Sequence, residues 1–134
     1  MNAALSTKLA TRFDDAVAYT RTALAQHGFG VLTEIDLRAA LRDQLGEDME
    51  DYRILGACNP AVAHRAISVD REIGLLLPCN VLVRADPRAA GTVIVEAMDP
   101  SLLVEVTGEP ALMTLAAELT ANLRGAIASL TESR

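Results

Sequence analysis

The C-terminal part of the chain carries the pattern that most constrains the fold. In the segment EPALMTLAAELTANLRGAIASL, leucine and isoleucine recur every three or four residues, at Leu112, Leu115, Leu119, Leu123, Ile127 and Leu130. This spacing predicts a long amphipathic helix, with Glu118 and Arg124 off its apolar stripe. Such a helix gains most of its stability from packing, so it requires a broad apolar surface elsewhere in the chain.

That surface is expected to be a β-sheet. Four runs are rich in β-branched residues and bounded by turn residues: FGVLTEI (29–35), YRILGAC (52–58), NVLVRAD (80–86) and TVIVEAMD (92–99). The last two, joined by PRAAG, are expected to form an antiparallel hairpin. In FGVLTEI, the residues Val31, Thr33 and Ile35 are predicted to share one face. STKLATRF (6–13) is expected to be a first strand or an extended arm, and LLVEVTG (102–108) a further short strand or an irregular connection.

Capping residues place three more helices between these runs. Thr11 and Asp14 are expected to form a capping box for a helix that ends at Gly28. Asp36 is a favourable N-cap for the short helix LRAALRDQL. Asn59 followed by Pro60 predicts a helix that continues to about Ile67. With the strands, these helices predict an α+β fold, a two-layer sandwich with a mostly antiparallel sheet packed against two long helices.

Length and charge limit the class of protein. The chain has 134 residues, enough for one domain over 1–134, and its net charge of −6 argues against nucleic-acid and membrane partners, which require clustered Lys and Arg. The first residues lack the apolar stretch of a signal peptide. We therefore expect a cytoplasmic protein, in which both cysteines are free thiols.

The two cysteines are the strongest candidates for a functional site. Cys58 stands before the Asn59–Pro60 helix start, where free backbone N–H groups favour a thiolate. Cys79 begins the next long strand and also precedes an asparagine, Asn80. His64 lies in the intervening helix. We predict Cys58, Asn59, His64, Cys79 and Asn80 as ligand-binding residues.

Two thiols and one imidazole would form an incomplete site for Cu(I) or Zn(II). No metal motif with standard spacing is present, however, so no metal ligand and no cofactor are assigned from the sequence. Each cysteine can equally be a small buried core residue. Three carboxylates at strand ends, Glu34, Asp36 and Asp99, are a further candidate cluster, for acid–base chemistry.

The segments HGFGVLTEIDL, YRILGACNPAVAHRAI, EIGLLLPCNVLV and AMDP, in this order, resemble the family called Domain of Unknown Function 302. The resemblance extends from about Phe13 to Leu130. It implies a small β-α-β(4)-α domain and a bacterial or archaeal cytoplasmic protein that self-associates. It implies no catalytic residues.

Three functions remain open. The first is a small cytoplasmic binding domain, with a cleft near Cys58, His64 and Cys79 that takes a small ligand or a soft metal. The second is a homodimeric interaction or structural protein with no chemistry of its own. The third is an enzyme that uses Cys58 as a nucleophile, which the absence of Ser-His-Asp spacing, a phosphate-binding loop or a standard metal motif disfavours.

Overall fold

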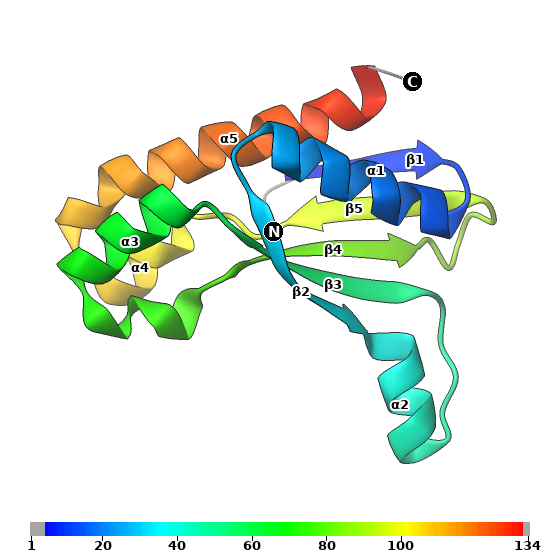
Figure 1. The fold of residues 1–134 in the computed structure, drawn as a ribbon. Helices are drawn as coiled ribbons and strands as arrows, with labels where there is room; N and C mark the ends of the chain where they lie inside the picture. Colours follow the sequence, from blue (N-terminus) through cyan, green and yellow to red (C-terminus); the bar gives the residue numbers. More distant parts are fainter. Residues whose placement is uncertain (1–4, 133–134) are drawn as a thin grey trace.

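Five antiparallel strands carry two long helices on one face, in the computed structural model that describes residues 5–132 (Figure 1). The strands lie in the order β1-β5-β4-β3-β2. Their bounds are β1 Ser6–Ala10, β2 Gly30–Asp36, β3 Tyr52–Cys58, β4 Cys79–Ala85 and β5 Thr92–Ala97. The helices are α1 Phe13–Gln26, α2 Leu37–Leu45, α3 Pro60–Val69, α4 Leu102–Thr107 and α5 Met113–Glu132, with short 3-10 helices η2 Arg71–Leu76 and η3 Pro110–Leu112. The predicted α+β sandwich is confirmed.

The core lies between the sheet and the pair α1 and α5. All six leucine and isoleucine side chains of the predicted stripe are buried, none more than 5% exposed. They belong to one buried cluster with the inward side chains of β3, β4 and β5, such as Leu55, Val81, Val83 and Val95, which are fully buried. Each buried aliphatic side chain of this size contributes about 2 kcal/mol of transfer free energy. Glu118 and Arg124 are exposed, as predicted.

The helix caps predicted at Asp36 and Gly28 are present, whereas the one predicted at Thr11 is not. The Asp36 side chain accepts a hydrogen bond from the N–H of Ala39 at 3.0 Å and begins α2. Gly28, with φ +88°, follows the end of α1 in the left-handed region that glycine tolerates best. The capping box at Thr11 is wrong. Helix α1 begins at Phe13 after Arg12, which makes no side-chain cap bond.

The segment at residues 102–108 is a helix, α4, and not a strand or an irregular connection. Its β-branched residues favour a strand, but the burial of Leu103 in the core, together with the turn before it, favours a helix. The Asp99 carboxylate accepts the N–H of Ser101 at 2.9 Å, and Gly108 ends the helix at φ +67°. Burial of Leu103, which is 1% exposed, against the core holds this single short helix in place.

A β-bulge in β2 separates residues that the sequence placed on one face. Val31 pairs with Ala57 and Thr33 pairs with Gly56, although Ala57 and Gly56 are consecutive residues of β3. The extra residue, Leu32, reverses the alternation of side chains. Val31 therefore packs against the core, whereas Thr33 and Ile35 lie on the opposite face.

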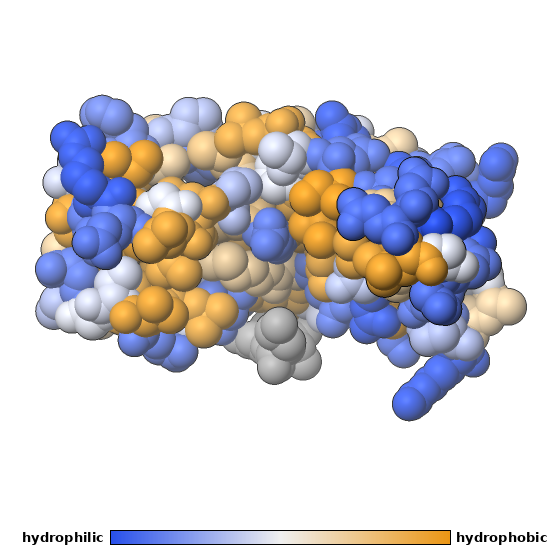
Figure 2. Space-filling model, turned by 90° about the horizontal axis from the view of Figure 1, so that it is seen from below, coloured by the Kyte–Doolittle hydropathy of each residue, from blue (hydrophilic) through white to orange (hydrophobic). Residues whose placement is uncertain are grey.

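The opposite face of the sheet is left uncovered by α1 and α5 (Figure 2). The strand register brings Ile35, Ile54 and Leu82 into one row on this face. Helix α2 projects beyond the sheet, and none of its residues is buried. Figure 2 shows apolar surface toward both ends of this face, over α2 and over the region of α3, η2 and α4. Within residues 5–132, no helix is long and apolar enough to cross a membrane.

The contact of α1 with α5 depends on a glycine. A Cβ atom added at Gly125 would lie 2.7 Å from Cδ2 of His27. The His27 ring is held by a 2.8 Å hydrogen bond between its Nδ1 and the carbonyl oxygen of Ala23, so it does not swing away freely. Close approach of the two helices therefore requires a residue without a side chain at this position.

We predict that Gly125→Ala lowers the free energy of unfolding by about 1–2 kcal/mol, because the new methyl group overpacks this contact. In a His27→Ala background the same substitution should instead stabilise the protein by about 0.5–1 kcal/mol, the usual gain in a helix interior. Urea denaturation of the four proteins in the cycle measures both effects. An unchanged stability of Gly125→Ala in the wild-type background would contradict the prediction.

Candidate functional site

Cys58 and Asn59 lie where β3 ends and α3 begins. Cys58 is the last residue of β3 and is half-buried. The Asn59 side chain accepts a hydrogen bond from the N–H of Val62 at 3.3 Å, and Pro60 is the first residue of α3. The predicted cap is confirmed. Because β3 feeds directly into α3, the Cys58 side chain is held beside the N-terminal end of that helix.

Cys79 lies on the neighbouring strand at the same end of the sheet. It is the first residue of β4, is 2% exposed, and pairs with Ala57, the residue before Cys58. Packing of Pro78 over β3 positions this strand start. A Cβ atom at Gly56 would lie 2.8 Å from Cγ of Pro78 and would clash with Oγ1 of Thr33. The absence of a side chain at Gly56 thus allows the chain to enter β4 close to β3.

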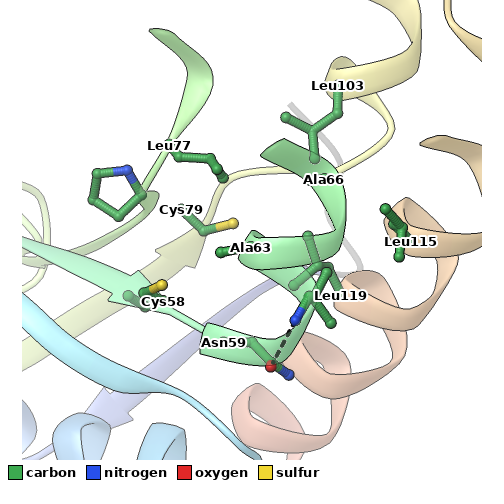
Figure 3. A pocket seen from close by; sticks show the side chains of 12 residues that line it. Cys58, Asn59, Ala63, Ala66, Leu77, Cys79, Leu103, Leu115 and Leu119 are labelled. Atoms are coloured by element: carbon green, nitrogen blue, oxygen red, sulfur yellow. Dashed lines mark hydrogen bonds between the residues drawn. The ribbon is translucent and has the colours of Figure 1, made fainter. Parts of the chain in front are cut away.

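Both thiols line one small cavity (Figure 3). Its volume is about 20 Å³, enough for about one water molecule. The remaining wall is almost entirely apolar and comes from β3, α3, the loop before β4, α4 and α5: Ala57, Asn59, Val62, Ala63, Ala66, Leu77, Pro78, Leu103, Leu115 and Leu119. In Figure 3 the side chains of Cys58 and Cys79 lie at the ends of their strands, near Ala63 of α3. The two cysteines, with 20 residues between them in the chain, therefore lie at the wall of the same cavity.

Two of the predicted site residues lie away from this cavity. His64 is exposed on α3 and lines a separate, open groove with Arg65, Ser68 and Thr114. Asn80 is exposed on β4, opposite Gly56 on the uncovered face, and its backbone oxygen accepts the N–H of Met98 at 3.0 Å. The structure therefore brings together Cys58, Asn59 and Cys79, and separates His64 and Asn80 from them.

Burial governs the chemistry of the inner thiol. Desolvation, together with the nearby Cys58, raises the pKa of Cys79 from 9.0 to about 11. Cys79 is thus a neutral thiol at physiological pH. Among residues 5–132, no group of three or more His, Cys, Asp or Glu side chains could hold a metal ion. Among the predicted ligand-binding residues, Cys58 and Cys79 contribute sulfur atoms to the cavity wall at this end of the sheet.

The three carboxylates do not converge. Asp36 is the last residue of β2, and Asp99 follows β5. Because β5 runs antiparallel to β2, the two residues lie at opposite ends of the sheet. Glu34 accepts hydrogen bonds from Arg21 at 2.6 Å and Arg53 at 2.8 Å. These contacts place Glu34 in a surface ion-pair network instead of an acid–base dyad.

Most of the cavity wall was not predicted from the sequence. Leu103 was missed because residues 102–108 read as a strand. Leu115 and Leu119 were recognised as core residues, but periodicity alone does not say which end of a sheet a helix residue covers. The loop residue Leu77 belongs to no periodic pattern of a helix or strand. The apolar run LLLPC before β4 was the one signal that this strand start is enclosed.

A five-stranded antiparallel sheet with two long helices on one face and a thiol-lined cavity at one end defines a small α+β domain. The family model described as "Domain of unknown function DUF302" matches residues 5–130, and the chain belongs to this family. A crystal structure of the uncharacterized conserved protein DUF302 from Bacillus stearothermophilus has the same fold, with a TM-score of 0.82 and 27% sequence identity over 92% of this chain and 94% of that chain. No curated protein matches the chain.

The raised pKa of Cys79 predicts a specific loss of stability at high pH. Folding favours the neutral thiol, so the unfolded chain releases this proton first, near pH 9, and the folded protein only near pH 11. This difference between the folded and unfolded pKa of Cys79 corresponds to about 2–3 kcal/mol of stability, present below pH 9 and lost as the pH rises to 11. Urea denaturation across this range measures the loss.

The matched control is Cys79→Ala, which removes this thiol but keeps every other group that titrates at high pH. The stability difference between wild type and variant should shrink by the same amount from pH 9 to pH 11. Parallel curves over that range would show that burial does not perturb the thiol.

Proposed function

We propose that this protein is a small cytoplasmic binding domain, a single domain over 1–134, whose ligand site is the cavity between Cys58 and Cys79. One observation carries the proposal: the two cysteines of the chain line the same small cavity. A reducing compartment keeps both thiols free for a ligand.

The dimensions of the cavity support a ligand of atomic size. About 20 Å³ holds about one water molecule, which is too little for an organic molecule. The apolar lining offers few hydrogen bonds to a polar guest. The favourable interaction available in this space is a bond to sulfur, so a soft ion fits better than a metabolite.

The cysteine-dependent enzyme has less support. A nucleophilic cysteine needs a base within hydrogen-bond reach, and no histidine or carboxylate is among the cavity-lining residues. His64, the nearest histidine in the chain sequence, is exposed on a different groove. The inner thiol, with its raised pKa, is the opposite of an activated nucleophile.

Titration of the reduced protein with Ag⁺, Cd²⁺ and Zn²⁺ tests the binding function. We expect at least one of these ions to bind with a stoichiometry of one per chain in native mass spectrometry, and to protect both thiols from alkylation. Cys58→Ala and Cys79→Ala should each abolish this tight one-to-one binding. If each thiol binds an ion independently, giving two per chain, or if no ion binds, the proposed function is wrong.

A homodimer is the second candidate, and a separate observation favours it. Leu32, Ile35 and Leu45 are 66%, 46% and 68% exposed, and all belong to β2 or to α2, which buries no residue in its own chain. Helix α2 contacts β3 through residues that are at most half-buried, and it leaves apolar side chains exposed to solvent. A second copy packed on α2 and the uncovered face of the sheet would supply the missing contact.

Sedimentation velocity tests this second candidate. We expect a dimer whose size is constant over a wide range of protein concentration, and a monomer after the double substitution Ile35→Lys/Leu45→Lys. The control is Met113→Lys, at a residue that is 61% exposed on α5, away from α2, and it should leave the dimer intact. A monomeric wild-type protein would exclude the homodimer.

A further inference from the structure

We propose that the exposed surface formed by α4 and η2 is a docking site for a basic amphipathic helix of a partner protein. This surface, the α4–η2 patch, consists of the apolar side chains of Leu75, Leu102 and Val106 and the carboxylates of Glu72 and Glu105. The inference concerns the outer surface of the domain, and it does not depend on the binding of an ion in the thiol cavity.

Three large apolar side chains of the patch are left exposed to solvent. Leu75 is 84% exposed, the highest value among the large apolar residues of the described part of the chain, and Val106 and Leu102 are 64% and 39% exposed. Helices α4 and η2 contact each other, so the three side chains belong to one end of the molecule, where Figure 2 shows apolar surface. A group of exposed apolar side chains with a polar rim is typical of an interaction surface.

Each of the two elements presents its apolar and its acidic side chains on the same face. Residues three apart in a 3-10 helix lie above one another, which places Glu72 beside Leu75 in η2. In α4, Glu105 and Val106 follow Leu102 by three and four residues, so these three residues share one side of the helix. The carboxylates therefore border the apolar side chains.

The charge of the patch specifies the chemistry of the partner. Residues 70–76 and 99–109 contain five carboxylates and one basic residue, Arg71. Within residues 5–132, the exposed side chains of Glu72 and Glu105 form no ion pair, so their negative charges are not compensated. A positively charged partner would gain from the apolar contact and from charge complementarity at the same time.

A second copy of the chain does not supply this positive charge. Its other exposed apolar surface includes α2, and residues 37–51, which form α2 and the loop after it, contain five carboxylates and only two arginines. An anionic membrane surface would be repelled by the carboxylates of the patch. A helix with lysine or arginine beside leucine at helical spacing matches both properties of the patch.

Calorimetric titration of the full chain tests the docking site. The probe is a synthetic peptide of about 18 residues, or about five helical turns, made of leucine and lysine at amphipathic spacing. We expect one peptide to bind per chain, with an affinity that falls as the salt concentration rises, because salt screens the attraction of the carboxylates. The same peptide with glutamate in place of lysine should not bind.

Two pairs of substitutions separate the apolar and the electrostatic contributions. Leu75→Asp/Val106→Asp should weaken binding of the leucine–lysine peptide by more than about 10-fold, since both side chains lie in the contact. The new carboxylates add negative charge, which alone would strengthen binding, so a loss of affinity reports on the apolar contact. Glu72→Gln/Glu105→Gln should weaken binding by about 2- to 10-fold and reduce its salt dependence.

The matched control is Leu32→Asp/Leu45→Asp, which makes the same change at the other apolar surface and should leave the peptide affinity unchanged. Circular dichroism checks the fold of each variant. If Leu75→Asp/Val106→Asp does not fold, Leu75→Asp alone carries the test, because Leu75 is the most exposed of these residues.

Several outcomes would overturn the docking site: no binding of the leucine–lysine peptide, full affinity in Leu75→Asp/Val106→Asp, or an equal loss of affinity in the control pair. Sedimentation with phosphatidylserine vesicles and sedimentation velocity test the other occupants. Vesicle binding that Leu75→Asp/Val106→Asp removes would assign the patch to a membrane surface. Conversion of a dimer into a monomer by the same variant would assign it to a second copy of the chain.

Discussion

Helices α1 and α5 pack side by side on one face of the sheet, and the other features of the molecule follow from this burial. Helix α5 packs over β1 and β5, and α1 packs over β2, β4 and β5, so that together they close off the inward residues of the sheet from water. Glycine at position 125 lets the two helices approach across the His27 ring. Since both long helices occupy the same face, the opposite face remains without a layer of its own, and α2 projects beyond the sheet edge (Figure 1).

The same packing encloses the thiol pair. The beginning of α5 supplies Leu115 and Leu119 to the cavity, and α3 and α4 complete the wall. Cys58 is the last residue of β3 and Cys79 is the first residue of β4, so both lie at the same end of the sheet. Their desolvation keeps the inner thiol protonated, which is the behaviour of a small hydrophobic residue. The cavity between the walls has room for about one water molecule.

The features predicted correctly are those that neighbouring residues determine. Asp36 and Asn59 each satisfy a backbone N–H three residues ahead, and such caps need no tertiary partner. The features missed depend on distant contacts. The strand-like segment at 102–108 became α4 because the core accommodates Leu103 there. The bulge at Leu32 arises from the register of β2 against β3, which the alternation within β2 does not contain.

The amino-acid sequence by itself determined the class of fold, the two long helices, the cap that follows Cys58 and the family, because periodicity, capping chemistry and short motifs are local properties. Only the tertiary structure decided which candidate residues meet. The strand order brings Cys79 close to Cys58, and the strand directions place Asp99 and Asp36 at opposite ends of the sheet. The rotation of α3 carried His64 outward, since Val62 and Ala66 occupy its buried side. These placements follow from the packing of whole elements, to which each residue contributes only a small part of the free energy.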